Sequence, residues 1–79
     1  MSGFTTTRFE CIDPAKNKKA FYTLSTGHGL FCFMLIRCWG RIGGRGHRLT
    51  KCFASEAEML LEYERLCRKR RQRRYSLTD

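Results

Sequence analysis

The segment "CWGRIGGRG" at residues 38–46 holds the single Trp of the chain, four of its seven glycines and two arginines. Glycine has no Cβ, so the backbone can turn tightly there and another chain can approach it closely. Trp39 stands at the end of an apolar run, directly before these glycines. The segment predicts a strand that ends at Trp39 and enters a glycine-rich bend.

Segments on both sides of this bend predict a small antiparallel sheet of about four strands. Apolar and polar residues alternate within them, and glycine or proline turn signals separate them, as is typical of hairpins. The expected strands are Phe4–Asp13, Lys19–Ser25, Leu30–Trp39 and Arg48–Ala54, with turns at 13–18, 26–29 and 40–47.

One C-terminal helix is predicted to begin after Ser55. Ser55 and Glu58 have the spacing of a capping box, and the acidic residues come first while the basic residues come last, as the helix dipole favours. Glu64 and Arg68 are spaced to pair at i,i+4. The expected sheet-facing stripe consists of Ala57, Leu60, Leu61, Tyr63 and Cys67, widened by Met59 and Leu66. The sequence therefore predicts an α+β fold.

The third expected strand is apolar on both of its faces. Leu30, Cys32, Met34 and Ile36 alternate with Phe31, Phe33 and Leu35. One helix covers only one face of a sheet, so the other face needs curling of the sheet, a terminal segment or a partner. A protein partner or a homodimer through this strand is one open expectation.

The charge of the chain points to a polyanionic partner. Sixteen Lys and Arg face seven Asp and Glu in 79 residues, and seven of the ten residues at 65–74 are basic. This excess on a single small domain, expected to span residues 1–79 with its core at 19–75, favours nucleic acid as the partner. The alternative is that the basic residues only keep the surface solvated.

Other functional classes find little support in the sequence. The five cysteines are odd in number and form no CxxC, so no disulfide framework or metal site is expected. His28 and His47 lie beside turn glycines with no acid placed by motif, so neither catalysis nor a cofactor is expected. The longest apolar run, Leu30–Ile36, has seven residues where a bilayer needs about 20. A cytoplasmic, membrane-free protein is expected.

The candidate binding residues surround the glycine-rich bend. The indole of Trp39 is either a plug of the core or a flat platform for a sugar or base. The basic side chains around it are suited to phosphates, and bare glycines let a ligand backbone approach. The expected site comprises Trp39, Gly40, Arg41, Arg37, Gly43, Arg45, His47, Arg48 and Lys51, with Arg68, Lys69, Arg70 and Arg71 from the helix end.

"WGRIG" followed closely by Gly46 resembles the WGR domain, which occurs in DNA-dependent poly(ADP-ribose) polymerases and in short bacterial proteins. The resemblance runs from about Lys19 to Tyr75 and includes "FYTL" at 21–24. It implies an antiparallel sheet with one main helix. It also implies that Trp39 stacks on a sugar at a DNA end and that Arg41 occupies the position that contacts neighbouring domains in the polymerases.

The resulting expectation is a stand-alone bacterial WGR domain that binds nucleic acid with little sequence preference, at DNA ends or nicks. Two alternatives stay open. One is a protein-interaction adaptor or self-associating module that docks through the third strand. The other is RNA binding through the arginine-rich helix end.

Overall fold

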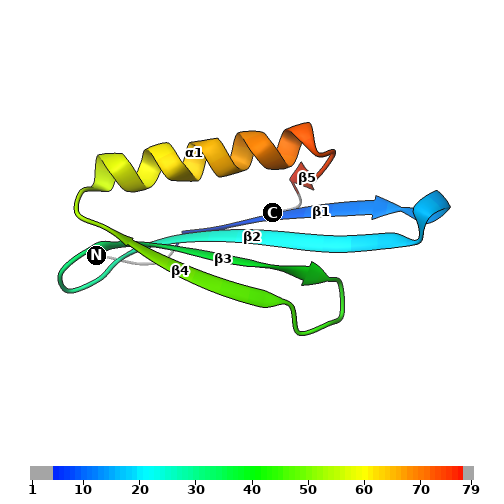
Figure 1. The fold of residues 1–79 in the computed structure, drawn as a ribbon, viewed down its shortest axis with the longest axis horizontal. Helices are drawn as coiled ribbons and strands as arrows, with labels where there is room; N and C mark the ends of the chain where they lie inside the picture. The colour runs from blue at the N-terminus through cyan, green and yellow to red at the C-terminus, as the bar shows by residue number, and fades with distance from the viewer. Residues whose placement is uncertain (1–4, 78–79) are drawn as a thin grey trace.

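The computed structural model describes residues 5–77, which form a twisted antiparallel sheet with one helix lying across one face (Figure 1). The elements are β1 (Thr5–Asp13), a 3-10 turn (Pro14–Lys16), β2 (Lys18–His28), β3 (Phe33–Arg41), β4 (His47–Phe53), α1 (Glu56–Gln72) and β5 (Ser76–Leu77). The strand order is β4-β3-β2-β1-β5. The expected α+β fold is confirmed, with five strands in place of about four. Phe4, the expected start of the first strand, lies outside the described residues.

The fifth strand was not predicted because it is only two residues long. After α1 ends, Arg74 adopts a left-handed conformation with φ of 66°, and the chain reverses. The two residues of β5 then pair with β1, with Leu77 opposite Phe9 and Ser76 opposite Glu10. Such a strand is too short to show an alternating pattern, and only its neighbour on the sheet defines it.

The hairpin between β2 and β3 turns later than residues 26–29, so that expectation was wrong. β2 continues through Gly27 to His28, which pairs with Phe33. The turn is closed by a hydrogen bond of 2.8 Å from the Gly29 amide to the Cys32 carbonyl. Gly27 remains in the strand because it pairs with Met34 of β3, which satisfies the hydrogen bonds of the backbone there. Leu30 and Phe31, expected in the third strand, are in the turn and are 88% and 93% exposed.

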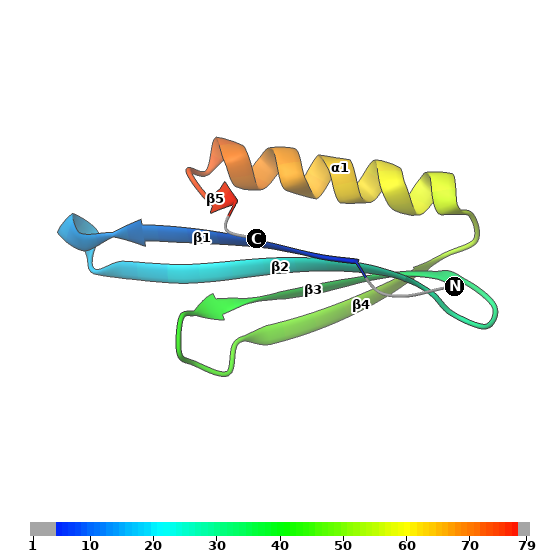
Figure 2. The same cartoon turned by 180° about the vertical axis from the view of Figure 1, so that it is seen from behind.

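The helix α1 lies over one face of the sheet (Figure 2), and the core is formed by side chains between the two. Phe9, Leu24 and Leu35 from the strands and Leu66 from the helix are the largest fully buried side chains. With so few buried residues, each one carries a large share of the stability of the domain.

The helix face that packs on the sheet differs from the expected stripe. Met59, Leu66 and Cys67 are buried, whereas Leu60 and Leu61 are 45% and 68% exposed. Ala57 is exposed as well. The helix carries two overlapping apolar faces in its sequence, and contact with the sheet selects the one that contains residues 59, 63, 66 and 67.

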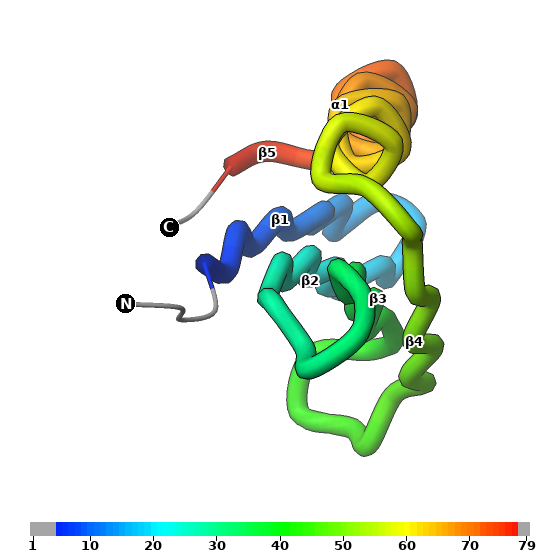
Figure 3. Tube along the Cα trace, turned by 90° about the vertical axis from the view of Figure 1, so that its left-hand side faces the viewer, coloured from blue at the N-terminus to red at the C-terminus, as the bar shows by residue number. Residues whose placement is uncertain are grey.

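The helix covers one face of the sheet, and the view along the sheet shows this clearly (Figure 3). Side chains alternate along β3, so Leu35, Arg37 and Trp39 face the helix. Met34 and Ile36 lie on the open face and are half-buried. Within the part of the chain that the structure describes, no second layer covers that face.

Candidate functional site

The glycine-rich bend between β3 and β4 begins with a close contact between two glycines. A Cβ on Gly40 would lie 2.6 Å from the Cα of Gly46, and a Cβ on Gly46 would lie 2.6 Å from the Trp39 carbonyl oxygen. Gly46 also has a φ of +74°, which disfavours any side chain. The ring of Phe21, which pairs with Gly40 across the strands, lies against both glycines. These contacts fix the end of β3 and thereby the position of Trp39.

Trp39 lies on the helix-facing side of the sheet and is half-buried. Its ring stacks on that of Tyr22, with centroids 6.4 Å apart and planes at 27°. The ring of His47 lies at 5.6 Å, and the guanidinium of Arg37 lies 5.5 Å from the indole centroid. The indole therefore packs against the edge of the core and still leaves part of its surface accessible.

A groove of about 420 Å³ lies beside this indole, between the sheet and the C-terminal end of α1. Three aromatic rings and three guanidinium groups face it together. Its lining consists of Ala20, Tyr22, Arg37, Trp39, Gly40, Arg70, Arg73 and Tyr75. The combination of flat rings and fixed positive charge suits a ligand that carries both a planar or sugar ring and a phosphate.

Arg70 is the helix residue that two aromatic rings hold in this groove. Its guanidinium carbon lies 4.2 Å from the ring centroid of Tyr22 and 5.3 Å from that of Tyr75. The Arg70 Nε and the Tyr22 hydroxyl are both buried, and neither has a hydrogen-bond partner in the described part of the chain. Buried polar groups are nearly always paired, so these two atoms are an exception, and they lie beneath the surface of the groove.

Few carboxylates neutralise the arginines of the described residues. In residues 5–77 the ion pairs are Arg8–Glu10 at 3.0 Å and Arg65–Glu62 at 2.7 Å. The hydrogen bonds from Arg65 hold the pKa of the Glu62 carboxyl below its usual range despite partial burial. The expected Glu64–Arg68 pair is absent from this range. Within residues 5–77 the groove guanidiniums form no ion pair, although Arg37 also helps to lower the pKa of Glu62.

Five of the expected site residues meet at or beside the groove. Arg37, Trp39, Gly40 and Arg70 line it, and His47 adjoins the indole. Arg41 follows on the same face of β3 and is exposed, with its Nη1 donating to the Asn17 carbonyl at 3.4 Å.

The other expected residues lie in five separate places. Gly43 and Arg45 are exposed in the β3–β4 turn. Lys51 borders a hollow with Arg37 and Glu62 beside the middle of α1. Lys69 is on the outer side of α1. Arg68 and Arg71 line a pocket between α1, β1 and β5. Arg48 pairs with Cys38, whose side chain faces away from the helix, so Arg48 points to the open face of the sheet. The basic segment is therefore distributed around the helix.

Four residues of the groove, Ala20 among them, were not in the expected site. Tyr22 and Tyr75 were noted only as part of the family resemblance, and Arg73 only as part of a basic run. A helical projection from the buried Leu66 would have placed Arg70 and Arg73 on adjacent positions of the sheet-facing side. Tyr22 lies opposite Trp39 in the register of β2 and β3, which the sequence does not specify.

The cysteines form no cluster with other metal-binding residues in the described range. No group of three or more His, Cys, Asp or Glu side chains that could hold a metal ion occurs in residues 5–77. The Cys52 thiol hydrogen-bonds that of Cys32 and raises the pKa of Cys32, and burial raises the pKa of Cys67.

No helix among these residues has the length and apolarity to span a bilayer.

Comparison with known proteins adds two findings. The family model described as WGR domain matches residues 5–79. The uncharacterized protein y4dW of Sinorhizobium fredii (strain NGR234) is 34% identical over 67 residues, which cover 84% of this chain and 33% of the relative. The chain thus spans about a third of the length of that curated relative.

Proposed function

Since the chain belongs to the WGR domain family, we propose that it is a non-catalytic module that binds nucleic acid largely without sequence preference and favours DNA ends or nicks. Family membership supports nucleic-acid binding in general. The observation that carries the proposal is the groove in which the half-buried Trp39 indole adjoins the guanidiniums of Arg37, Arg70 and Arg73.

In the proposed complex, Trp39 stacks on an exposed sugar or base and the three arginines bind the adjoining phosphates. A continuous duplex keeps its bases stacked on one another, whereas an end or a nick exposes a face that an indole can cover. Such a stack contributes about 1–3 kcal/mol per base.

Contacts further along the duplex come from the exposed basic residues on the same side. Arg41 follows the groove on β3. In the proposed complex it binds a phosphate, whereas the matching residue of the polymerases contacts a neighbouring domain. Arg45, beside the bare backbone of Gly43, reaches from the turn, and Lys51 extends the surface along β4. His47, next to the indole, can donate a hydrogen bond.

Fluorescence of the single Trp tests the proposal directly. The protein is titrated with blunt, nicked and closed circular duplexes of equal sequence at two salt concentrations. We expect quenching by the blunt and nicked duplexes and much less by the closed circle. Log–log plots of affinity against salt should fall by about 0.9 per phosphate contacted. Affinity that does not depend on salt, or equal quenching by all three, would contradict the proposal.

A second candidate function is a protein-interaction or self-association module. The observation that favours it is the pair Leu30 and Phe31, adjacent in the β2–β3 turn and 88% and 93% exposed. Size-exclusion chromatography with light scattering, with and without DNA, separates the two functions. A stable homodimer or protein complex that shows no DNA shift at low salt would favour this candidate. Competition between single-stranded RNA and nicked DNA compares the affinities for the two and tests RNA as the ligand.

A further inference from the structure

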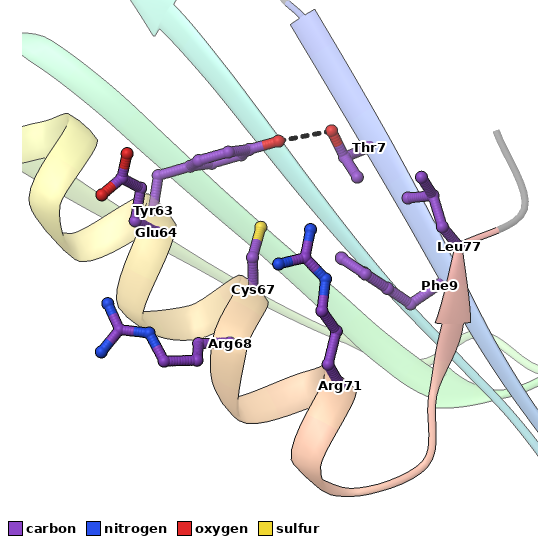
Figure 4. A pocket seen from close by; sticks show the side chains of 8 residues that line it. All are labelled: Thr7, Phe9, Tyr63, Glu64, Cys67, Arg68, Arg71 and Leu77. Carbon is purple, nitrogen blue, oxygen red and sulfur yellow. Dashed lines mark hydrogen bonds between the residues drawn. The ribbon is translucent and has the colours of Figure 1, made fainter.

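A second pocket, of about 450 Å³, lies between α1, β1 and β5 (Figure 4) and shares no lining residue with the Trp39 groove. It is enclosed by the C-terminal half of the helix, by β1 and by the short strand β5. Polar and charged groups from all of these elements except β5 border it, and Phe9 and Leu77 give it an apolar wall. The function proposed above makes no use of this pocket.

A pair of hydroxyl groups forms one end of the pocket. The Tyr63 hydroxyl and the Thr7 Oγ1 are hydrogen-bonded at 2.5 Å. When Tyr63 donates in that bond, the Thr7 hydroxyl keeps a free proton; when Thr7 donates, the Tyr63 proton lies beside the Cys67 thiol, which also interacts with it. The pair can therefore donate one more hydrogen bond to a ligand in the pocket.

Arg71 brings positive charge to the same place. Figure 4 shows its side chain directed toward Cys67 and the hydroxyl pair, whereas Arg68 extends away from them. Arg71 forms no ion pair within residues 5–77. Its charge acts on the pocket, because it opposes the burial that raises the pKa of Tyr63 and of Cys67, whereas the Glu64 carboxylate adds to the rise at Cys67. The one carboxylate of the lining, Glu64, extends from the opposite side of Tyr63.

We propose that this pocket binds a phosphate group, with Arg71 and the Thr7–Tyr63 hydroxyl pair as its donors. A guanidinium offers two parallel N–H groups that match two phosphate oxygens, and the free hydroxyl proton reaches a third. The pocket is larger than a single phosphate, and its apolar wall suits the sugar attached to that phosphate. A sugar–phosphate unit of a nucleic-acid backbone combines these features.

The position of the pocket gives it a distinct role. Arg70 and Arg71 are adjacent in sequence, yet Arg70 faces the Trp39 groove and Arg71 faces this pocket. The end of the helix would then lie between two phosphate-binding sites. The identity of the ligand as nucleic acid rests on the proposed function, whereas the phosphate chemistry of the pocket does not.

Titration with inorganic phosphate, followed by NMR at constant ionic strength, tests the pocket alone. We expect saturable shifts of the Thr7 amide and of the Arg71 side-chain Nε–H. Arg71→Gln should weaken phosphate binding there roughly ten-fold or more, as expected for a lost charged hydrogen bond. The matched control Lys69→Gln removes the same charge from the outer side of the helix and should have little effect. Tyr63→Phe should also weaken binding while the ring keeps its packing.

Three outcomes would overturn the phosphate site. One is that phosphate leaves the Thr7 and Arg71 signals unchanged. Another is that Arg71→Gln and Lys69→Gln behave alike. The third is that acetate binds as tightly as phosphate, which would indicate a carboxylate site for an acidic protein segment.

A parallel titration with duplex DNA identifies the source of the phosphate. We expect DNA to shift the Arg71 signal together with the Trp39 indole signal. Inorganic phosphate binding at Arg71 without any DNA binding would support the pocket and contradict the proposed function, so the two failures are distinguishable.

Discussion

The guanidinium of Arg70 lies 4.2 Å from the ring centroid of Tyr22, so a cation–π contact fixes the basic end of the helix over the sheet. Tyr22 in turn stacks on Trp39. Trp39 before the glycine-rich bend and Arg70 in the arginine-rich segment, which are 31 residues apart in the sequence, thus meet through one tyrosine.

Trp39→Ala is expected to weaken binding to blunt or nicked duplex about ten-fold, because the stack on the exposed nucleotide is lost. Affinity for closed circular duplex should change much less. Trp39→Phe retains a flat ring and should retain most of the preference for ends. Fluorescence anisotropy with labelled DNA measures these affinities, and circular dichroism verifies the fold since Trp39 packs against the core. Equal losses on both substrates would remove the stacking role.

Arg70→Gln is expected to lower the salt dependence of DNA binding by about 0.9 in the log–log slope, as for one lost phosphate contact. Arg48→Gln is the matched control: it removes the same charge from the open face of the sheet and should leave the slope nearly unchanged. Binding constants at four or more salt concentrations give the slopes. A larger effect for Arg48 than for Arg70 would place the interface on the other face.

Gly46→Ala is expected to lower the free energy of unfolding by about 1–3 kcal/mol, since a strained φ is combined with a clash against the Trp39 carbonyl. Gly43→Ala provides the comparison, because Gly43 also has a positive φ but nothing lies within 4 Å of its Cβ position. Its cost should be limited to about 1 kcal/mol of backbone strain. Urea denaturation measures both. Similar values would show that the close approach of Gly40 and Gly46 contributes nothing.

Leu24→Ala is expected to destabilise the domain by about 2–5 kcal/mol, because Leu24 is fully buried and leaves a cavity. A loss of this size is comparable to the whole stability of a small domain. Phe31→Ala removes a larger side chain that is 93% exposed and should leave the melting temperature nearly unchanged. Thermal denaturation of the two variants compares them. If Phe31→Ala also lowers the melting temperature, the aromatic tip is buried in solution, as in a dimer.

Glu62 should contribute to the pH dependence of stability. Its pKa is lowered in the folded state by Arg65, so its contribution is present above the ordinary glutamate value and is lost as pH falls through the folded value. The effect should be small, since the Arg65 side chain is largely in solvent. Denaturation of wild type and Glu62→Gln between pH 3 and 7 measures it, with pH values chosen around the reference pKa of about 4.3. Curves that converge at low pH agree with this sign, and curves that separate there contradict it.

Local sequence determined the elements whose signals are complete within a short segment. The capping box at Ser55 and Glu58 specified the start of the helix, and the structure shows the Ser55 hydroxyl accepting from the Glu58 amide at 3.2 Å. The alternating segments specified four strands, and the glycines after Trp39 specified the bend. Each of these depends on backbone conformation and on contacts between residues close in sequence.

Tertiary structure alone decided which side chains came together. The sequence permitted two apolar faces of the helix and several directions for the basic segment, and it misplaced the β2–β3 turn. Long-range packing placed Leu66 and Met59 against the sheet. It extended the pairing of β2 and β3 to His28 and Phe33. It also placed Arg70 between Tyr22 and Tyr75. Strand register and helix rotation depend on burial summed over the whole domain, and that sum is not contained in any local segment.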